Sequence, residues 1–122
     1  MPPIQPGFVF RVKALRAHPW VVLSAPTLDN PKFVAANWST LDDTCIDDAC
    51  ILNRADHPLI TRPSTMIFSR ARLWDSDRLS SGIDQQALEV LPQVSAIVLK
   101  RIIDGARKSP ELRQEWKDLL PQ

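Results

Sequence analysis

Four strand-length runs in the first two thirds of the chain decide the fold that we predict. They read His18-Pro19-Trp20-Val21-Val22-Leu23-Ser24, Val34-Ala35-Ala36-Asn37-Trp38-Ser39-Thr40, Asp56-His57-Pro58-Leu59-Ile60 and Ile67-Phe68-Ser69-Arg70-Ala71-Arg72. Turn-forming residues such as Asp29-Asn30-Pro31 separate the runs, which is typical of short strands. The second run ends in an amide and two hydroxyl residues, so polar groups gather where that strand stops.

The run from residue 33 to residue 40 has two distinct faces, because side chains alternate along a strand. One face carries Val34, Ala36 and Trp38, and the other carries Phe33, Ala35, Asn37 and Ser39. Residues 20–23 are apolar without interruption, which favours a central strand that is covered on both sides.

We expect further strands on either side of these runs. In residues 7–13, Phe8, Phe10 and Val12 alternate with Val9, Arg11 and Lys13, the pattern of a half-buried strand. Residues 49–52 and 59–60 predict two short strands. Residues 64–73 predict the last strand of the chain.

The C-terminal third changes to a helical period. Residues 84–91 predict a short helix that Pro92 ends, and a second helix follows from Pro92 to Arg107, with apolar residues over more than half of its circumference. Ser109-Pro110-Glu111 predicts a third helix start, because serine caps helices and proline tolerates the first turn. The pattern indicates a mainly β protein with C-terminal helices, an α+β fold.

Composition limits the class of protein. The 122 residues, 44% hydrophobic and 24% charged, suit one globular domain and argue against a disordered or a membrane protein. The net charge of +1 provides no broad basic field, so any contact with nucleic acid must be local. The N-terminal residues lack the pattern of a secretory signal, and we therefore expect a cytoplasmic protein with no membrane contact.

We expect neither a disulfide nor a metal site. Cys45 and Cys50 are close enough in sequence to close a small loop, but a reducing compartment favours free thiols. His18 and His57 are isolated, and the acidic residues between 42 and 48 lack the glycine and terminal glutamate of a calcium loop.

The order of these motifs resembles the PemK/MazF family of toxins, and some divergent phage-borne and prophage-borne members look closer still. In that family a basic residue precedes a Pro-apolar-apolar strand, and here His18 stands before Pro19. Asn37-Trp38-Ser39-Thr40 is similar to an Asn-apolar-Thr-Thr motif, and Ala55-Asp56-His57-Pro58-Leu59-Ile60 is similar to Gly-Asp-His-Pro-Phe-Ile. The chain departs from the Arg-x-Asp pair of some members, because residues 68–72 hold arginines and no acid.

The resemblance implies a single domain, 1–122, with an SH3-like barrel over about 7–73 and helices over about 84–120. It also implies a homodimeric, metal-independent endoribonuclease toxin that cleaves single-stranded RNA, needs no cofactor and pairs with a cognate antitoxin protein. The catalytic candidates are His18, Ser39 and Arg70, with Thr40 the alternative hydroxyl, and the substrate-binding candidates are Asn37, Thr40, Arg72 and His57.

Ordinary chemistry supports these roles and leaves others open. Imidazole titrates near neutrality, so His18 can act as base or acid, and Arg70 or Arg72 can hold a phosphate. Ser39 can equally satisfy backbone groups at a strand end. A non-catalytic module that binds RNA or protein on the same barrel is the rival function, and a phage accessory protein that merely assembles is a third.

Overall fold

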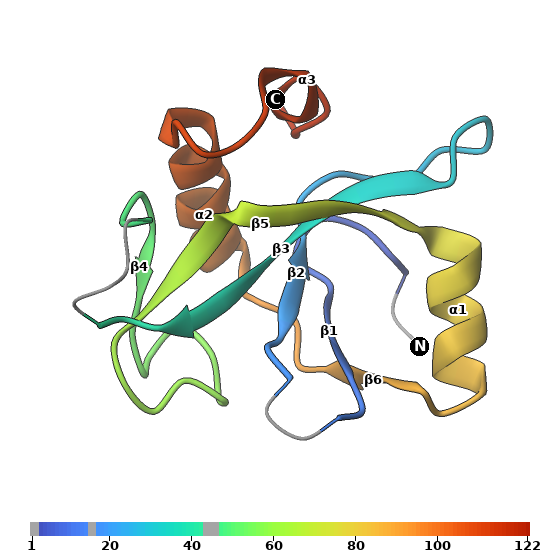
Figure 1. The fold of residues 1–122 in the computed structure, drawn as a ribbon, viewed down its shortest axis with the longest axis horizontal. Helices are drawn as coiled ribbons and strands as arrows, with labels where there is room; N and C mark the ends of the chain where they lie inside the picture. The colour runs from blue at the N-terminus through green and yellow to red at the C-terminus, as the bar shows by residue number, and fades with distance from the viewer. Residues whose placement is uncertain (1–2, 15–16, 43–46) are drawn as a thin grey trace.

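The computed structural model describes residues 3–14, 17–42 and 47–122. Within these residues, six strands form one open antiparallel sheet in the order β4-β5-β3-β2-β1-β6 (Figure 1). The strands are β1 (Val9–Val12), β2 (Trp20–Val22), β3 (Lys32–Thr40), β4 (Ile51–Leu52), β5 (Ser64–Asp75) and β6 (Leu88–Leu91). The helices are α1 (Ser76–Asp84), α2 (Ala96–Lys108) and α3 (Gln114–Lys117).

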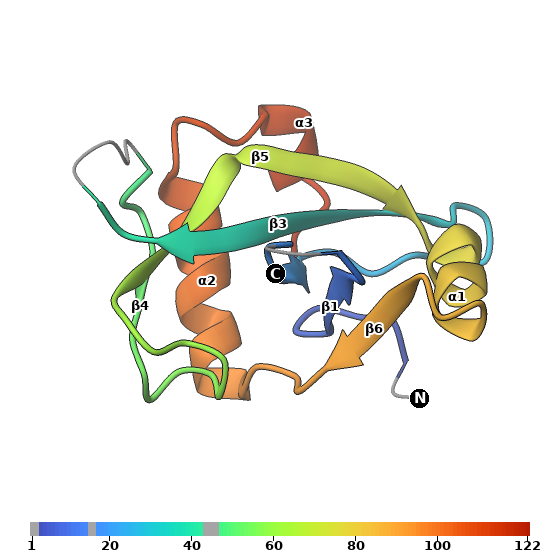
Figure 2. The ribbon, with the colours of Figure 1, turned by 60° about the horizontal axis from the view of Figure 1, so that its bottom comes forward.

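The sheet buries side chains on both faces, and a different helix covers each. One core joins Val34, Ala36 and Trp38 of β3 to Ile102 and Ala106 of α2. The other core brings together residues in and just before β1, residues of β2 and β3, and α1; its buried members are Phe8, Phe10, Val22, Phe33, Ala35 and Leu79. Figure 2 shows α2 and α1 at opposite ends of the long strands. The predicted alternation of residues 33–38 between two faces is therefore confirmed.

Strand β5 leaves the regular ladder in its middle. Ala35 of β3 pairs with Arg72, whereas Asn37 pairs with Ile67, so residues 68–71 bulge out of register. The carboxylate of Asp47, which is buried, accepts the N–H of Ser69 at 3.1 Å. This bond satisfies a backbone donor that has lost its place in the ladder.

Helix α1 and strand β6 correct the prediction of a helix over residues 84–91. The carboxylate of Asp75 caps α1 by accepting the N–H groups of Asp77 and Arg78, and the bond from Arg78 holds the pKa of Asp75 below its usual value. The helix ends at Asp84, and Gln86 follows with a positive φ of 61°. Residues 88–91 then pair with β1 as an edge strand, because a two-residue period lets their apolar side chains share the aromatic core.

Two smaller predictions are also wrong. Residues 59–60 form no strand, because the backbone turns there. The N–H of Ile60 donates to the carbonyl of His57 at 3.1 Å. Ser109 does not start a helix but ends α2, where its N–H bonds to the carbonyl of Gly105. The last helical turn, α3, begins instead after Arg113.

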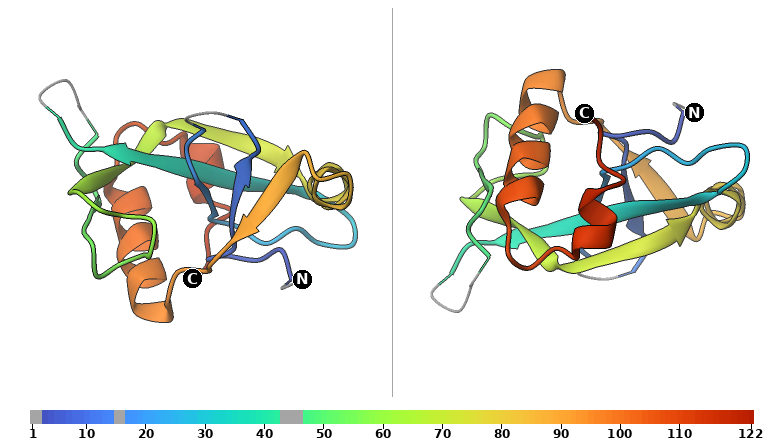
Figure 3. Two further views of the ribbon diagram at one scale, coloured as in Figure 1. Left: turned by 90° about the horizontal axis from the view of Figure 1, so that it is seen from below. Right: turned by 90° about the horizontal axis from the view of Figure 1, so that it is seen from above.

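The remaining expectations for strands and for the long helix are confirmed within a few residues. The fold is mainly β with a few helices, an α+β arrangement, as expected. Figure 3 shows α2 and α3 on the same side of β3 and β5. None of the helices in the described part of the chain combines the length and apolar composition that crossing a bilayer requires.

Gly105 permits a close contact between α2 and the segment just before β4, and its replacement is expected to destabilise the protein. A Cβ atom there would lie 2.8 Å from both the carbonyl oxygen of Ala49 and the Cβ of Cys50. Overpacking of this kind costs about 1–3 kcal/mol, and the better helix propensity of alanine offsets up to about 1 kcal/mol. We expect Gly105→Ala to lower the free energy of unfolding by about 1–2 kcal/mol in urea titrations.

Gly82→Ala is the matched control. The three atoms nearest to its Cβ all belong to the side chain of Leu88, and the nearest, at 2.7 Å, is a terminal methyl that can move away. Equal losses of stability in the two variants would contradict the close packing inferred at Gly105.

Candidate functional site

A pocket of about 240 Å³ lies where β1 and β3 end and two loops meet. We call it the His18 pocket. Arg11 of β1 and Trp38, Ser39 and Thr40 of β3 contribute strand residues. The loops contribute His18, Pro19, Leu59, Ile60, Thr61 and Arg62, and β5 contributes its first residue, Ser64. Three of the sequence candidates, His18, Ser39 and Thr40, are therefore brought together.

Backbone pairing positions the two sides of this pocket. The carbonyl of Pro19 accepts the N–H of Trp38 at 3.3 Å, which ties the loop of His18 to β3. Ser39 and Thr40 pair with Thr65 and Ser64 of β5. His18 is exposed and Ser39 is half-buried, so an imidazole and a hydroxyl are presented to the same space.

Two arginines that the sequence prediction did not select line the same pocket. Arg11 forms an ion pair with Glu89 of β6, with Nη2 2.6 Å from the carboxylate, and both side chains are about one-third exposed. Arg62 is exposed in the loop before β5. The sequence places a cation beside Thr61 and Pro63, but only the fold shows that this turn meets the end of β3.

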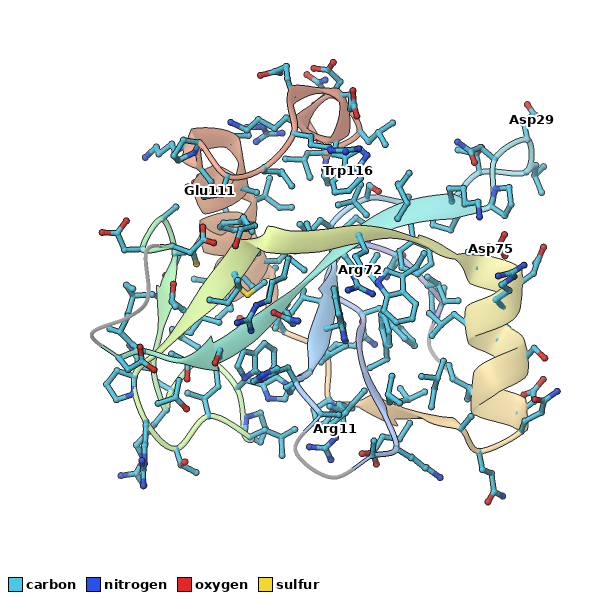
Figure 4. All side chains as sticks on the ribbon, viewed as in Figure 1. Arg11, Asp29, Arg72, Asp75, Glu111 and Trp116 are labelled. Atoms are coloured by element: carbon cyan, nitrogen blue, oxygen red, sulfur yellow. The ribbon has the colours of Figure 1, made fainter. Side chains whose placement is uncertain are left out.

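Arg70 and Arg72 lie elsewhere on β5 and do not line the His18 pocket. Arg70 belongs to the bulge, and Arg72 pairs with Ala35 near the aromatic core. Both are exposed. Figure 4 shows Arg72 midway along the sheet and Arg11 well below it, at the end of the strands.

Asn37 is placed away from the opening. It is only 5% exposed and pairs with Trp20 on one side and Ile67 on the other. Its Oδ1 has no hydrogen-bond partner among the described residues. A substrate could reach this amide only if neighbouring side chains moved.

His57 supports the pocket from behind. It is 3% exposed, and its ring lies 4.9 Å from the ring of Trp38. Its Nε2 lies 2.6 Å from the carbonyl oxygen of Pro92, and its Nδ1 accepts the N–H of Leu59 at 3.1 Å. Both nitrogens are used within the protein, and His57 contacts two residues of the pocket lining, Trp38 and Leu59.

A second pocket, of about 290 Å³, lies between α2 and β4 and includes Cys50. Arg101 crosses this region, bonding to Asp56 at 2.7 Å and to the carbonyl of Ile51 at 2.8 Å. Cys50 is a free, buried thiol, as expected, whereas Cys45 lies outside the described residues. Burial raises the pKa of Cys50 to about 11, although the nearby Arg101 favours the thiolate.

Among the described residues, no group of three or more histidine, cysteine or acidic side chains is arranged to hold a metal ion. No protein-family model matches the sequence. No curated protein matches it with significance.

The thiol of Cys50 is expected to make the fold sensitive to alkali. Its pKa is about 11 in the folded protein against an ordinary value of 9.0, so the unfolded chain releases this proton first. The resulting stability is present below about pH 9 and is lost as the pH rises towards about 11. In urea titrations at pH 8 and pH 10.5, the wild type should lose more stability between the two conditions than Cys50→Ala.

The comparison is between the two pH-dependent losses of stability. Any destabilisation from a cavity at the alanine is present at both pH values and therefore cancels. An identical pH-dependent loss in the two proteins would show that Cys50 ionises as easily folded as unfolded.

Proposed function

We propose that this protein is a PemK/MazF-like endoribonuclease that cleaves single-stranded RNA at the His18 pocket. The observation that carries the proposal is the meeting of His18, Ser39 and Thr40 in one pocket with Arg11 and Arg62. The first three stand at the positions that the motif resemblance marks, although they come from different parts of the chain. In this proposal the curved open sheet corresponds to the SH3-like barrel of that family.

The reaction needs no metal in this proposal. The 2'-oxygen of a ribose attacks the adjacent phosphorus, the bond from phosphorus to the 5'-oxygen breaks, and a 2',3'-cyclic phosphate remains. His18 takes the proton of the 2'-hydroxyl, and the leaving 5'-oxygen takes a proton from water or from the imidazolium of His18. Arg11 and Arg62 stabilise the charge that develops on the phosphorane oxygens.

The other candidates take secondary roles. Ser39 or Thr40 positions the scissile phosphate through a hydroxyl. Arg11 and Arg62 replace Arg70 as the cations nearest the chemistry, because they line the pocket and Arg70 does not. Arg72 and Asn37 remain candidates for contacts with more distant parts of an RNA strand.

A homodimer and an antitoxin partner belong to the same proposal. The apolar face of α2 around Val98 packs mostly on its own sheet, since Val98 is 6% exposed. Ile97, next to it, is 77% exposed and is available for contact with a second copy. An antitoxin would inhibit by covering the His18 pocket.

A non-catalytic RNA-binding module is the second candidate. No carboxylate lines the His18 pocket among the described residues, so no acidic side chain stands there to share proton transfer with His18. Binding would need only the arginines and the hydroxyl groups.

The cleavage experiment separates these two functions. Purified protein, incubated with single-stranded RNA and a metal chelator, should produce fragments that end in a cyclic phosphate. His18→Ala should lose on the order of 10²-fold or more in rate, because it removes a general base. Ser39→Ala should lose less, since a positioning hydroxyl contributes less than proton transfer. RNA binding without cleavage by the wild type would support the binding module instead.

The arginines can be tested by salt dependence. Arg62→Ala should weaken RNA binding and reduce the slope of log K against log salt by about 1, as expected for one lost phosphate contact. Arg78→Ala, on α1, is the control and should leave the slope unchanged. Equal slopes in all three proteins would remove Arg62 from the proposed site.

Sedimentation tests the homodimer. At micromolar concentration the protein should sediment at about twice the chain mass of 13.8 kDa. Ile97→Asp should shift the equilibrium to monomer, because a buried carboxylate in the interface would lack a partner. A monomeric wild type would contradict the dimer.

A further inference from the structure

His57 is held in one protonation state by two bonds of opposite type. The carbonyl of Pro92 can only accept a hydrogen bond, so Nε2, 2.6 Å away, must carry the proton. The N–H of Leu59 can only donate, so Nδ1, 3.1 Å away, must be bare. The observed geometry therefore requires a neutral imidazole in the Nε2–H form.

These bonds connect directly to the wall of the His18 pocket. Leu59 and the next three residues, Ile60, Thr61 and Arg62, all line it. The carbonyl of His57 also accepts the N–H of Ile60 at 3.1 Å. On its other side the imidazole packs against Trp38, which lines the pocket as well.

We propose that His57 is a positioning residue that holds the 59–62 wall of the His18 pocket while its imidazole is neutral, and that protonation of His57 releases this wall. A second proton on Nδ1 would face the N–H of Leu59, leaving two donors opposed and no acceptor between them. The contact is part-buried, with a ring that is 3% exposed, so water compensates its loss only in part. The wall must then move away or the ring must turn, and turning breaks the bond to Pro92.

Few charged groups surround His57 to oppose this effect. On its own loop, Asp56 is adjacent in sequence, but its carboxylate is 7% exposed and already paired with Arg101 of α2. From β3 the ring meets uncharged Trp38, and from the segment before α2 it meets the carbonyl of Pro92. The ring itself makes no ion pair with a carboxylate among the described residues, so no direct partner balances a new positive charge there.

The first test does not depend on any activity. The chain has two histidines, so His18→Ala leaves His57 as its only imidazole. Nitrogen-15 NMR of this variant should show the Nε2–H form at pH 8. As acid protonates His57, the protection factor of the Leu59 amide against hydrogen exchange should fall on the order of tenfold, the loss expected for one hydrogen bond.

The amide of Val34 is the control, because it donates to Ser24 Oγ at 2.8 Å in the core and should keep its protection. The inference is overturned if Leu59 stays protected while His57 becomes charged. It is equally overturned if His57 stays neutral until the whole protein unfolds.

Two substitutions separate the two bonds. In His57→Asn the amide oxygen can take the place of Nδ1 and accept the N–H of Leu59. In His57→Gln the amide nitrogen can reach the carbonyl of Pro92, but the N–H of Leu59 is left without an acceptor. We expect His57→Asn to keep the Leu59 amide protected at pH 8 and at acid pH. We expect His57→Gln to lose that protection at both. Full protection of Leu59 in His57→Gln would overturn the inference.

The consequence for ligand binding rests on the proposed function. In the inactive His18→Ala background, a fluorescent single-stranded RNA should bind less tightly by about tenfold once His57 is charged, and the added His57→Asn change should abolish this pH dependence. If wild-type protein neither binds nor cuts RNA, the proposed function fails, while the exchange of the Leu59 amide still decides the role of His57. If RNA binds with the same pH dependence in both backgrounds, His57 does not control the pocket.

Discussion

Strand β3 is buried on both of its faces, and this constraint organises the rest of the protein. Residues 33–36 alternate between an aliphatic core under α2 and an aromatic core beside α1. A strand in this position needs apolar residues in succession, partners on both edges and a cover on each side. β2 and β5 supply the edges, and the two helices with their neighbouring segments supply the covers.

The same strand delivers the candidate site at the point where its burial ends. Trp38 is the last buried residue of β3, followed by half-buried Ser39 and exposed Thr40. Polar groups can stand here because one side opens to solvent while the backbone remains paired with β5. The His18 loop is tied to this end through Pro19, and the 59–62 loop is tied to it through His57 and Trp38. The pocket is thus the meeting of two loops on one strand end.

Buried polar groups fix the irregular parts of the fold. Asp47 holds the bulge of β5, and Ser24 continues the β2–β3 ladder by accepting the N–H of Val34. His57 does the same for the turn that walls the pocket. Each of these side chains satisfies a backbone group that regular pairing leaves unpartnered, and each is therefore costly to replace by an apolar residue.

Local sequence determined the strands over residues 9–12, 20–22, 32–40 and 64–75 and the long helix α2, because alternation and helical period reflect burial directly. It also indicated His18, Ser39 and Thr40 by their motifs. Short-range signals misled at residues 84–91, where pairing with β1 overrode helical propensity, although the cap at Asp75 was available to mark α1. Only the tertiary structure shows that Arg11 and Arg62 lie beside His18, that Arg70 lies outside the pocket and that His57 is buried. These positions depend on loop packing and on the bulge of β5, which no local period in the sequence encodes.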